Sequence, residues 1–455
     1  MSPSVQLGLL IEGAAAVATL AGGLRRGSAQ ADAAVVTGGG PEGAGGGGSV
    51  AVAVWDGRIL AVGPAADVHR QIEAAGHSVA AFARLDAAGG LVTPGLIDAH
   101  THLVFAGTRE LEWQMRAHGA GYLEVLAAGG GILSTVAATR AASADELLEG
   151  ARRRLAQMLA CGTTTAEAKS GYGLDVATEL RQLGAIGQLS AEGPVELVPT
   201  FLGAHAVPTE YRVAPGGATR PDATEAYVGS VIGEQLPAVA RQGIARFCDV
   251  FCEKGVFSAD QSRRILRAAA DLGLAARLHA DELAPSGGAE LAAELASGSG
   301  CASADHLAAP SEWGVAALVR AAAGEHPVVA TLLPATSWFL GKHHFAPARR
   351  FIAAGIPVAL ATDLNPGTSP TVSLPFVMSI ACVEMDLSPA EALVAVTINA
   401  AHAVGRGLEI GSIEPGKQAD LVVWDVPSVE QLPYWLGARL ARTVVKRGRV
   451  VFERA

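Results

Sequence analysis

Eight short apolar segments, separated by helical stretches, recur along the middle of the chain and limit its possible folds more than any other feature. Such alternation over about 270 residues is typical of an α/β protein whose parallel strands close into a (β/α)8 TIM-type barrel. A doubly wound open sheet is the alternative, but no glycine-rich phosphate-binding fingerprint follows the first segment, which favours the barrel. The eight predicted strands are residues 91–97, 163–168, 195–202, 246–251, 275–278, 302–304, 328–333 and 358–361.

Two of the intervening helices carry a recognisable start signal. Ser143 with Glu146, and Ser258 with Gln261, match the capping box, in which the first side chain and the fourth satisfy each other's backbone N–H groups. The helices that follow are predicted over residues 145–160 and 265–272.

Both ends of the chain predict short β-strands. Residues 50–55 and 58–62 are apolar runs joined by Asp-Gly, a pair typical of a tight hairpin. A similar pattern returns over residues 419–424 and 443–452. We therefore expect one small β domain, built from both ends and interrupted by the barrel.

The apolar stretch over residues 5–20 is interpreted as the opening of that domain. It contains Glu12, no basic stretch precedes it, and it is shorter than a membrane span, although a weak signal peptide is the alternative reading. Residues 38–48 are nearly all glycine and are predicted to form a flexible surface loop.

Composition excludes several classes of function. Thirty-four Lys and Arg residues face 44 Asp and Glu residues, for a net charge of −10, and the chain has no basic run. Nucleic acids are bound mainly through clustered cations, so we expect no nucleic-acid partner, and we expect no membrane association. Five cysteines in no paired pattern predict a reducing, cytoplasmic location.

Polar residues follow most of the predicted strands, whose own bodies are apolar. Because the C-terminal ends of all barrel strands meet at one mouth, these residues are expected to be neighbours. A single histidine at a strand end is more often a hydrogen-bonded core residue, but His100 and His102 lie on one side of an extended segment. With a third imidazole and a carboxylate they suit zinc or ferrous iron. The strand-end residues are His100, His102, Lys169, His205, His279, Glu282, His306 and Asp363.

Several motifs carry a family resemblance. Residues 94–102, Pro-Gly-Leu-Ile-Asp-Ala-His-Thr-His, and residues 411–423 near the end resemble the amidohydrolase superfamily of metal-dependent barrels with a small β-sandwich. From about residue 50 onward the chain resembles, more narrowly, the imidazolonepropionase family. The supporting segments are 100–109, 169–174, 201–205, 249–256, 279–282, 303–306 and 361–368.

The resemblance implies an organisation and an activity. Residues 1–93 and 405–455 would form the sandwich domain and residues 94–404 the hydrolase barrel. The activity would be hydrolytic ring opening of 4-imidazolone-5-propanoate to N-formimidoyl-L-glutamate, in histidine degradation, by a metal-activated water. The implied partners are this small-molecule substrate and a second copy of the chain in a homodimer.

The resemblance also implies roles for matched residues. One divalent metal, zinc or iron, would be bound by His100, His102, His279 and Asp363. The proton-transfer residues would be Glu282 and His306. The substrate-binding residues would be Arg109, Tyr122, Tyr172, His205, Asn365, Gly367 and Thr368.

Each role has a simpler structural alternative. Arg109 suits a carboxylate because a guanidinium forms two parallel hydrogen bonds with it, but it also suits a solvated pair with Glu110. Tyr172 between two glycines also suits a loop anchor, and Glu282 a helix N-terminus. Lys169 either pairs with a nearby carboxylate, which we prefer, or is carboxylated to bridge two metals.

Other features of the sequence leave alternatives open. Cys248 and Cys252 are interpreted as buried small hydrophobic residues, and His343 with His344 as a surface pair. Ala335 stands where the family resemblance suggests glycine. The competing functions are another mononuclear amidohydrolase, acting on a cyclic amide or deaminating a heterocycle, and a catalytically silent scaffold.

Overall fold

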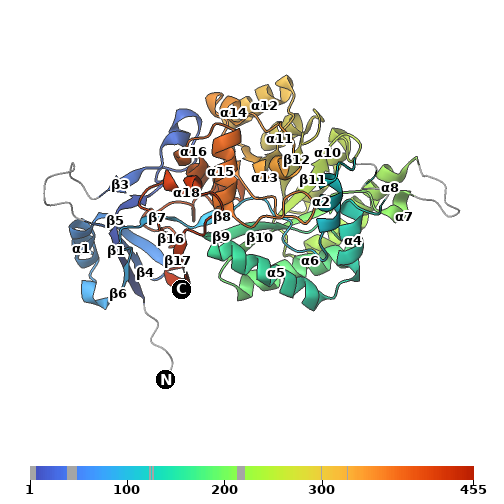
Figure 1. Cartoon of the computed structure of the whole chain (residues 1–455). Coiled ribbons are helices and arrows are strands. Elements are labelled where there is room, and N and C mark those ends of the chain that lie inside the picture. Colours follow the sequence, from blue (N-terminus) through green and yellow to red (C-terminus); the bar gives the residue numbers. More distant parts are fainter. Residues whose placement is uncertain are drawn as a thin grey trace.

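The computed structural model describes residues 7–37, 49–121, 124, 128–212, 221–298, 300–324 and 326–454. A small β domain lies at one end of the molecule and a barrel surrounded by helices at the other (Figure 1). The strands β1 (Gly8–Ala14) and β17 (Ala441–Lys446), which are far apart in the sequence, both lie in the β domain.

Eight parallel strands form the barrel, and each pairs with the next in sequence order. They are β8 (Leu96–Asp98), β9 (Thr163–Lys169), β10 (Glu196–Ala204), β11 (Phe247–Cys252), β12 (Ala275–Ala280), β13 (Cys301–His306), β14 (Val329–Leu332) and β15 (Val358–Leu360). The ring closes just beyond β8 and β15, where the His102 N–H donates to the Leu364 carbonyl (2.9 Å) and the Asp363 N–H to the His100 carbonyl (3.0 Å). The predicted barrel is confirmed.

The predicted first strand, residues 91–97, is in fact two strands. β7 (Leu91–Pro94) belongs to the small domain and β8 to the barrel, with Gly95 between them. A Cβ on Gly95 would lie 2.2 Å from the Thr164 hydroxyl, so only glycine allows the chain to cross here. The apolar pattern is continuous because the segment is buried on both sides of the break.

Two sheets form the small domain, with strands from both ends of the chain. One has the order β5 (Arg58–Pro64), β4 (Val50–Trp55), β1 (Gly8–Ala14), β6 (Phe82–Asp86). The other has the order β18 (Arg449–Glu453), β17 (Ala441–Lys446), β16 (Leu421–Trp424), β7, β2 (Ala16–Ala18), β3 (Val35–Thr37). The stretch read as the opening of a folded domain therefore supplies β1 and β2.

The predicted hairpin joins β4 to β5. Asp56 and Gly57 have φ values of 47° and 74°, and two left-handed residues in succession are what a tight hairpin turn requires. Buried side chains of both sheets, including Ile11, Val52 and Val423, pack into one apolar cluster. The predicted glycine loop, residues 38–48, lies outside the described residues.

Helices cover the outside of the barrel and one face of the small domain (Figure 1). Both capping boxes are confirmed, at the starts of α5 (Ala144–Ala160) and α10 (Ala259–Asp271). The other helices near the strand ends or the barrel surface are α2 (Glu110–Ala117), α4 (Ile132–Ala141), α6 (Val176–Glu192), α7 (Thr209–Arg212), α8 (Ala223–Ser230), α9 (Leu236–Gln242), α11 (Gly288–Ala296), α12 (Glu312–Ala322), α13 (Pro334–Phe339), α14 (Ala348–Ala353), α15 (Leu374–Glu384), α16 (Pro389–Ala395) and α17 (Ile398–Ala403). Outside these, α1 (Ala65–Ala74) packs on β4 and β5, and α18 (Gln431–Tyr434) on α15.

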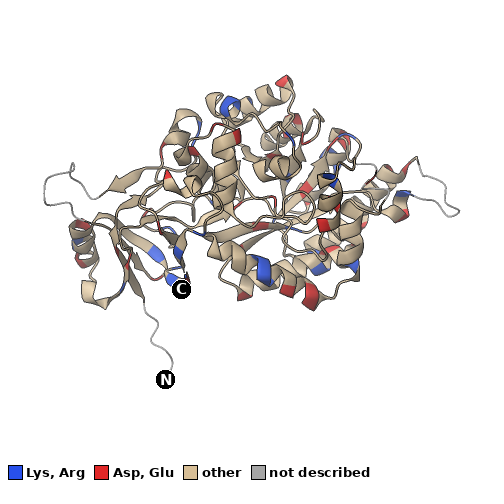
Figure 2. Cartoon of the chain, viewed as in Figure 1, with Lys and Arg blue, Asp and Glu red and all other residues tan. Residues whose placement is uncertain are grey.

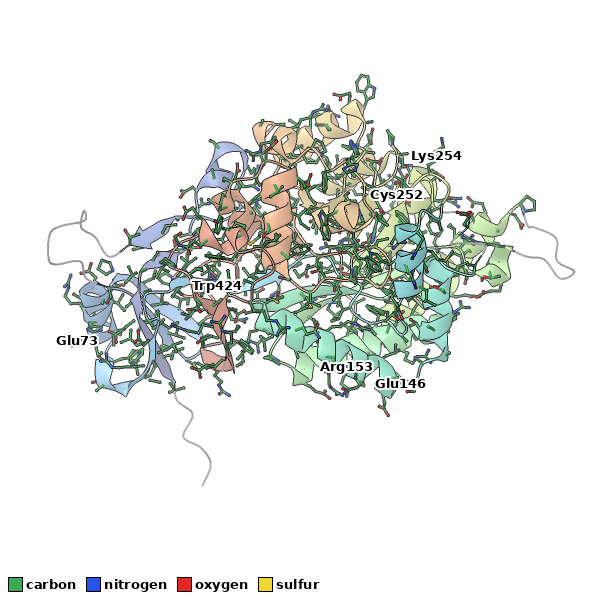
Figure 3. All side chains as sticks on the ribbon, in the orientation of Figure 1. Glu73, Glu146, Arg153, Cys252, Lys254 and Trp424 are labelled. Carbon is green, nitrogen blue, oxygen red and sulfur yellow. The ribbon has the colours of Figure 1, made fainter. Side chains whose placement is uncertain are left out.

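Trp424 of β16 joins the small domain to the barrel, and Figure 3 labels it between the two. Its indole N–H donates to the Thr93 hydroxyl (2.8 Å), and its buried ring belongs to the barrel's apolar cluster. Gly162, after α5, leaves room for that ring, because a Cβ there would lie 2.7 Å from it. The two domains therefore share a packed core, which fixes their positions relative to each other.

The surface carries both signs of charge. Figure 2 shows acidic and basic residues interspersed on the outer helices, and several form pairs, such as Arg263 with Glu294 (2.9 Å). Among the described helices, none combines the length and hydropathy needed to cross a membrane. All five cysteines are free thiols, and Cys248 and Cys252 are buried, as the sequence predicted.

Candidate metal centre and substrate pocket

Four side chains at the C-terminal ends of three strands meet at the barrel mouth. His100 and His102 follow β8, His279 lies near the end of β12, and Asp363 follows β15. Asp363 Oδ1 lies 3.6 Å from His100 Nε2 and 3.5 Å from His102 Nε2, and the Nε2 atoms of His102 and His279 lie 3.4 Å apart. The structure therefore brings together all four predicted ligands.

These separations fit a metal ion. Two ligand atoms about 2.0–2.1 Å from a tetrahedral zinc lie about 3.3–3.4 Å apart, close to the distances between these four side chains. His100 Nε2 is buried and has no hydrogen-bond partner among the described residues, as expected of an atom that faces a cation. Three other groupings at the mouth also place donor atoms within 4.8 Å of one another, and they involve His205, His306, Asp249 and Asp305.

Two buried aspartates orient the predicted ligand histidines from behind. Asp305 Oδ2 lies 2.6 Å from His100 Nδ1, which leaves the Nε2 of that ring facing the mouth. Asp249 Oδ1 accepts the backbone N–H of His279 (3.0 Å), and its Oδ2 lies 3.0 Å from His279 Nδ1. Carboxylates in this position fix ring orientation and raise ligand basicity. The sequence analysis did not identify either aspartate as a partner of a histidine; the available signal was a charged residue within a buried strand.

Lys169 belongs to a buried charge network behind the site. Its ammonium donates to Asp249 Oδ2 (2.7 Å) and Glu167 Oε1 (2.9 Å), in line with the pairing that we preferred over carboxylation. Arg277 is fully buried, donates to Asp305 Oδ2 (3.1 Å) and lies 3.8 Å from Glu167 Oε1. Charges buried this deeply persist only when they are paired.

The titration behaviour of most ligands favours metal binding. Burial, aided by the charge of Lys169, keeps the pKa of His100 well below its usual value, and burial also lowers the pKa of His102. Burial alone would raise the pKa of Asp363, but its hydrogen bond from His102 and the charge of His306 lower it to about 2. Neutral imidazole and ionised carboxylate are the forms that coordinate metals.

His279 differs from the other two histidines. Burial would lower its pKa, but the adjacent Asp249 carboxylate outweighs that effect and raises the pKa. Metal binding here therefore competes with a proton as the pH falls.

Glu282 and His306 lie together beside the ligands. Glu282 Oε2 is 3.7 Å from His306 Nε2, and both side chains line one cavity. His306 ends β13 with a left-handed backbone (φ 72°), an uncommon conformation for a residue other than glycine that turns the chain sharply at the mouth.

The loop that carries Glu282 is held on both sides of it. Asp281 accepts backbone N–H groups at the start of α11, including that of Ala289 (3.0 Å). The buried Glu253 accepts the Leu283 N–H (2.8 Å). Glu282 is therefore positioned by its two neighbours, rather than serving as a helix cap itself.

Tyr172 is placed by a buried carboxylate. Glu179 accepts the N–H groups of Gly171 (3.0 Å), Gly173 (2.8 Å) and Leu174 (2.8 Å), which shapes the loop after β9. Within that loop Tyr172 is almost fully buried, and its ring lies 5.7 Å from the ring of His102. Burial raises its pKa, so the phenol is protonated and can donate a hydrogen bond.

His205 stacks on a predicted metal ligand. Its ring lies 4.8 Å from that of His102 with an interplanar angle of 11°. Its Nδ1 lies 2.9 Å from the Gly171 carbonyl, which can only accept, so Nδ1 carries the hydrogen. Burial holds its pKa well below the usual value, so the ring is neutral and Nε2 is an acceptor.

Arg109 does not form the predicted alternative pair with Glu110. Its Nε and Nη2 donate to the two oxygens of Glu112 (both 2.8 Å), and its Nη1 lies against Gly367. A Cβ on Gly367 would lie 1.9 Å from that nitrogen, which explains the glycine. Glu112 is a buried partner that the sequence analysis did not identify.

The loop after β15 uses the Asn365 side chain internally. Asn365 Oδ1 accepts from the Gly367 N–H (2.9 Å) and from the Thr368 N–H (2.8 Å) and hydroxyl (3.0 Å), and Nδ2 donates to the Asp363 carbonyl (2.7 Å). These bonds shape the loop next to Arg109. Tyr122, also predicted to bind substrate, lies outside the described residues.

Comparisons with known proteins agree on one family. The model of the Amidohydrolase family matches residues 91–451. Imidazolonepropionase from Geobacillus kaustophilus (strain HTA426) is 52% identical over 400 residues, which cover 88% of this chain and 89% of that protein. Imidazolonepropionase from Symbiobacterium thermophilum is 48% identical over 446 residues, which cover 98% and 97%.

Solved structures with the same fold are more distant in sequence. E. coli guanine deaminase has a TM-score of 0.67 at 16% identity, covering 98% of this chain and 99% of that one. A zinc-bound adenosine deaminase from Xanthomonas campestris has a TM-score of 0.63 at 20% identity, covering 97% and 92%. At these identities the likeness shows the fold alone.

Proposed function

The chain belongs to the imidazolonepropionase family of amidohydrolases, and we propose that it hydrolyses 4-imidazolone-5-propanoate to N-formimidoyl-L-glutamate in histidine degradation. The observation that best supports this is the group of three histidines and Asp363 at the barrel mouth, with a carboxylate and another imidazole beside it. That arrangement suits hydrolysis of a cyclic amide.

The reaction balances without a redox partner. The oxygen of water adds to the ring carbonyl carbon, and the bond from that carbon to the ring nitrogen breaks. The nitrogen takes up a proton and becomes part of the formimidoyl group, while the carbonyl carbon becomes a carboxylate. The chain must therefore remove a proton from water and deliver one to nitrogen.

We assign one divalent metal ion, zinc or iron, to His100, His102, His279 and Asp363. When bound, such an ion lowers the pKa of a coordinated water from about 16 towards 7 and polarises a carbonyl oxygen. Asp305 and Asp249 orient two of these imidazoles from behind.

Glu282 takes the proton from the attacking water and passes it to the departing ring nitrogen. Its loop is anchored at both neighbouring residues, and its carboxylate lies beside His306. His306 donates towards the ring carbonyl oxygen as negative charge develops there.

The remaining residues orient the substrate. His205 presents an acceptor at Nε2, which suits a ring N–H, and Tyr172 presents a phenolic donor. Arg109 recognises the propanoate carboxylate, and Glu112 holds its guanidinium at the loop that contains Gly367 and Thr368. Tyr122 and Asn365 complete the proposed set, Asn365 by shaping that loop.

An activity assay with metal analysis tests the proposal. The purified protein should open the ring of 4-imidazolone-5-propanoate and contain about one zinc or iron per chain. Ammonia release from an aminated heterocycle, without ring opening of the imidazolone, would instead indicate a deaminase. A stoichiometry near two metals per chain would indicate a bridged pair through Lys169.

We also expect a cytoplasmic homodimer that does not bind nucleic acid. Light scattering after gel filtration tests the dimer, and an elution mass of one chain would contradict it.

A further inference from the structure

A cavity opens beside the proposed proton-transfer residues. Its lining includes Glu282, His306, Thr336 and Lys342. Thr336 donates its hydroxyl to Oδ2 of the metal ligand Asp363 (2.6 Å), so the cavity adjoins the metal centre directly. Lys342 is the one lysine or arginine in this lining.

The position of Lys342 is fixed by the end of α13. Gly341 has a left-handed backbone (φ 65°), its N–H donates to the Trp338 carbonyl (3.0 Å), and the Lys342 N–H donates to the Ser337 carbonyl (2.9 Å). This pair of bonds is the Schellman motif, which closes a helix with a defined exit direction. Lys342 is half-buried, whereas the next residues, His343 and His344, are exposed as predicted.

The Lys342 ammonium is available for a ligand. Among the residues that the structure describes, no carboxylate lies within 4 Å of its Nζ, and its side chain forms no hydrogen bond. By contrast, the other lysine beside the site, Lys169, is shared between two buried carboxylates. Arg109, to which the propanoate carboxylate is assigned, does not line this cavity.

The proposed reaction creates a new anion at this place. Both oxygens of the new carboxylate are atoms at the reacting centre, one from water and one from the ring carbonyl. Since Glu282 must reach that water, the new carboxylate forms next to Glu282 and His306. The propanoate carboxylate, already present in the substrate, is assigned to Arg109.

We infer that Lys342 binds the carboxylate created by ring opening, and so makes this cavity a product subsite. The inference rests on the proposed function, and it assigns separate cations to the two carboxylates of the product. Lys342 would contribute little to the affinity for the intact ring, whose amide is neutral, and much to the affinity for the opened product.

Two ligands that differ only in the new carboxylate test its contribution to binding. N-formimidoyl-L-glutamate carries it, whereas N-formimidoyl-4-aminobutyrate retains the formimidoyl group and the tail carboxylate but lacks it. Binding is measured by calorimetry on the metal-loaded enzyme. Lys342→Met should weaken binding of N-formimidoyl-L-glutamate at least about ten-fold, the usual scale for a charge-assisted pair. It should weaken binding of N-formimidoyl-4-aminobutyrate less than about two-fold. Lys342→Arg should restore most of the loss.

Matched measurements make the result decisive. Lys254→Met, at an exposed lysine labelled in Figure 3, should leave both affinities unchanged. If Lys342→Met lowers the affinity for both ligands equally, Lys342 contacts the tail carboxylate. If it lowers neither affinity, Lys342 lies outside the site. Either result overturns the inference. Because binding is measured directly, these outcomes are separate from a failure of the ring-opening assay, which would contradict the proposed function.

Discussion

His100 Nδ1 lies 2.6 Å from Asp305 Oδ2, and this contact turns the other nitrogen of the ring towards Asp363. The pair links two strand ends that are 205 residues apart in sequence. The same aspartate accepts from the buried guanidinium of Arg277 (3.1 Å). One carboxylate therefore connects a proposed metal ligand to the charge network behind the site.

Asp305→Asn should weaken metal binding while retaining the shape of the site. Removing the negative charge lowers the basicity of His100, and loss of such a partner typically costs about 10–100-fold in metal affinity. Competition with a chromophoric chelator measures this on the metal-free protein, independently of turnover. Asp260→Asn, at an exposed carboxylate of α10, is the control and should bind metal as the wild type does; equal affinities for all three proteins would exclude a role for Asp305.

Glu282→Gln should separate proton transfer from metal binding. Glutamine keeps the size and hydrogen bonding of the side chain but cannot accept the proton of water, so we expect kcat to fall at least about a hundred-fold. Metal content should be unchanged, because Glu282 is not among the four ligands. Near-normal turnover at full metal occupancy would transfer the role to His306, and His306→Gln should then show the loss.

Most strand ends could be predicted from the sequence because a polar residue follows an apolar run there. His100, His279 and Asp363 stand where the pattern placed them, and the barrel alone explains why they meet. The carboxylates that contact these histidines from behind could not be assigned from the sequence in the same way. Asp249, in the middle of β11, and Asp305, near the end of β13, are fully buried, and only the three-dimensional packing shows which histidine each one contacts.

Two further local features could not be predicted from the sequence. The break at Gly95 is invisible in a hydrophobic pattern that continues on both sides of it. The Asn365 amide forms hydrogen bonds to its own loop through both its oxygen and its nitrogen, which no spacing rule reveals. Short-range hydrogen bonding by Asn competes with any other use of the side chain.

Arg109→Met should raise KM for the natural substrate. A charge-assisted pair with a carboxylate contributes about 1.5–3 kcal/mol, which corresponds to a ten- to hundred-fold change, and the propanoate does not take part in bond breaking. We therefore expect a smaller effect on kcat. Glu110→Gln, at the exposed neighbouring residue, is the control. An unchanged KM in Arg109→Met would remove this arginine from the substrate site.

Gly367→Ala should mimic the loss of Arg109. The added Cβ would lie 1.9 Å from Arg109 Nη1, so the guanidinium must move from its position. We expect KM to rise, and the double variant with Arg109→Met to show less than the sum of the two effects, as residues in contact do. Gly233→Ala is the matched control, because its Cβ would meet nothing within 4 Å. Full additivity in the double variant would mean that the two residues act separately.

We expect the ion pairs of Glu196, at the junction of the two domains, to contribute to stability in a pH-dependent way. This first residue of β10 lies 2.8 Å from Arg406 Nη1 and 3.2 Å from Lys446 Nζ of β17. Burial would raise its pKa, but the charge of Lys446 and the hydrogen bond and charge of Arg406 outweigh burial and lower the pKa to about 2. A depressed pKa stabilises the fold above the unfolded value of about 4.5, and that contribution is lost as the pH falls from there towards 2.

Glu196→Gln should therefore destabilise the protein at pH 7 by on the order of 2–3 kcal/mol. The difference from wild type should shrink as the pH is lowered below about 4.5, because the wild-type carboxylate then takes up a proton as well. Thermal unfolding of both proteins between pH 7 and pH 3 measures this difference. Glu192→Gln removes an exposed pair with Arg152 and should change stability little at any pH. A Glu196→Gln effect that stays constant across this range would show that the residue acts through packing or neutral hydrogen bonds rather than through its charge.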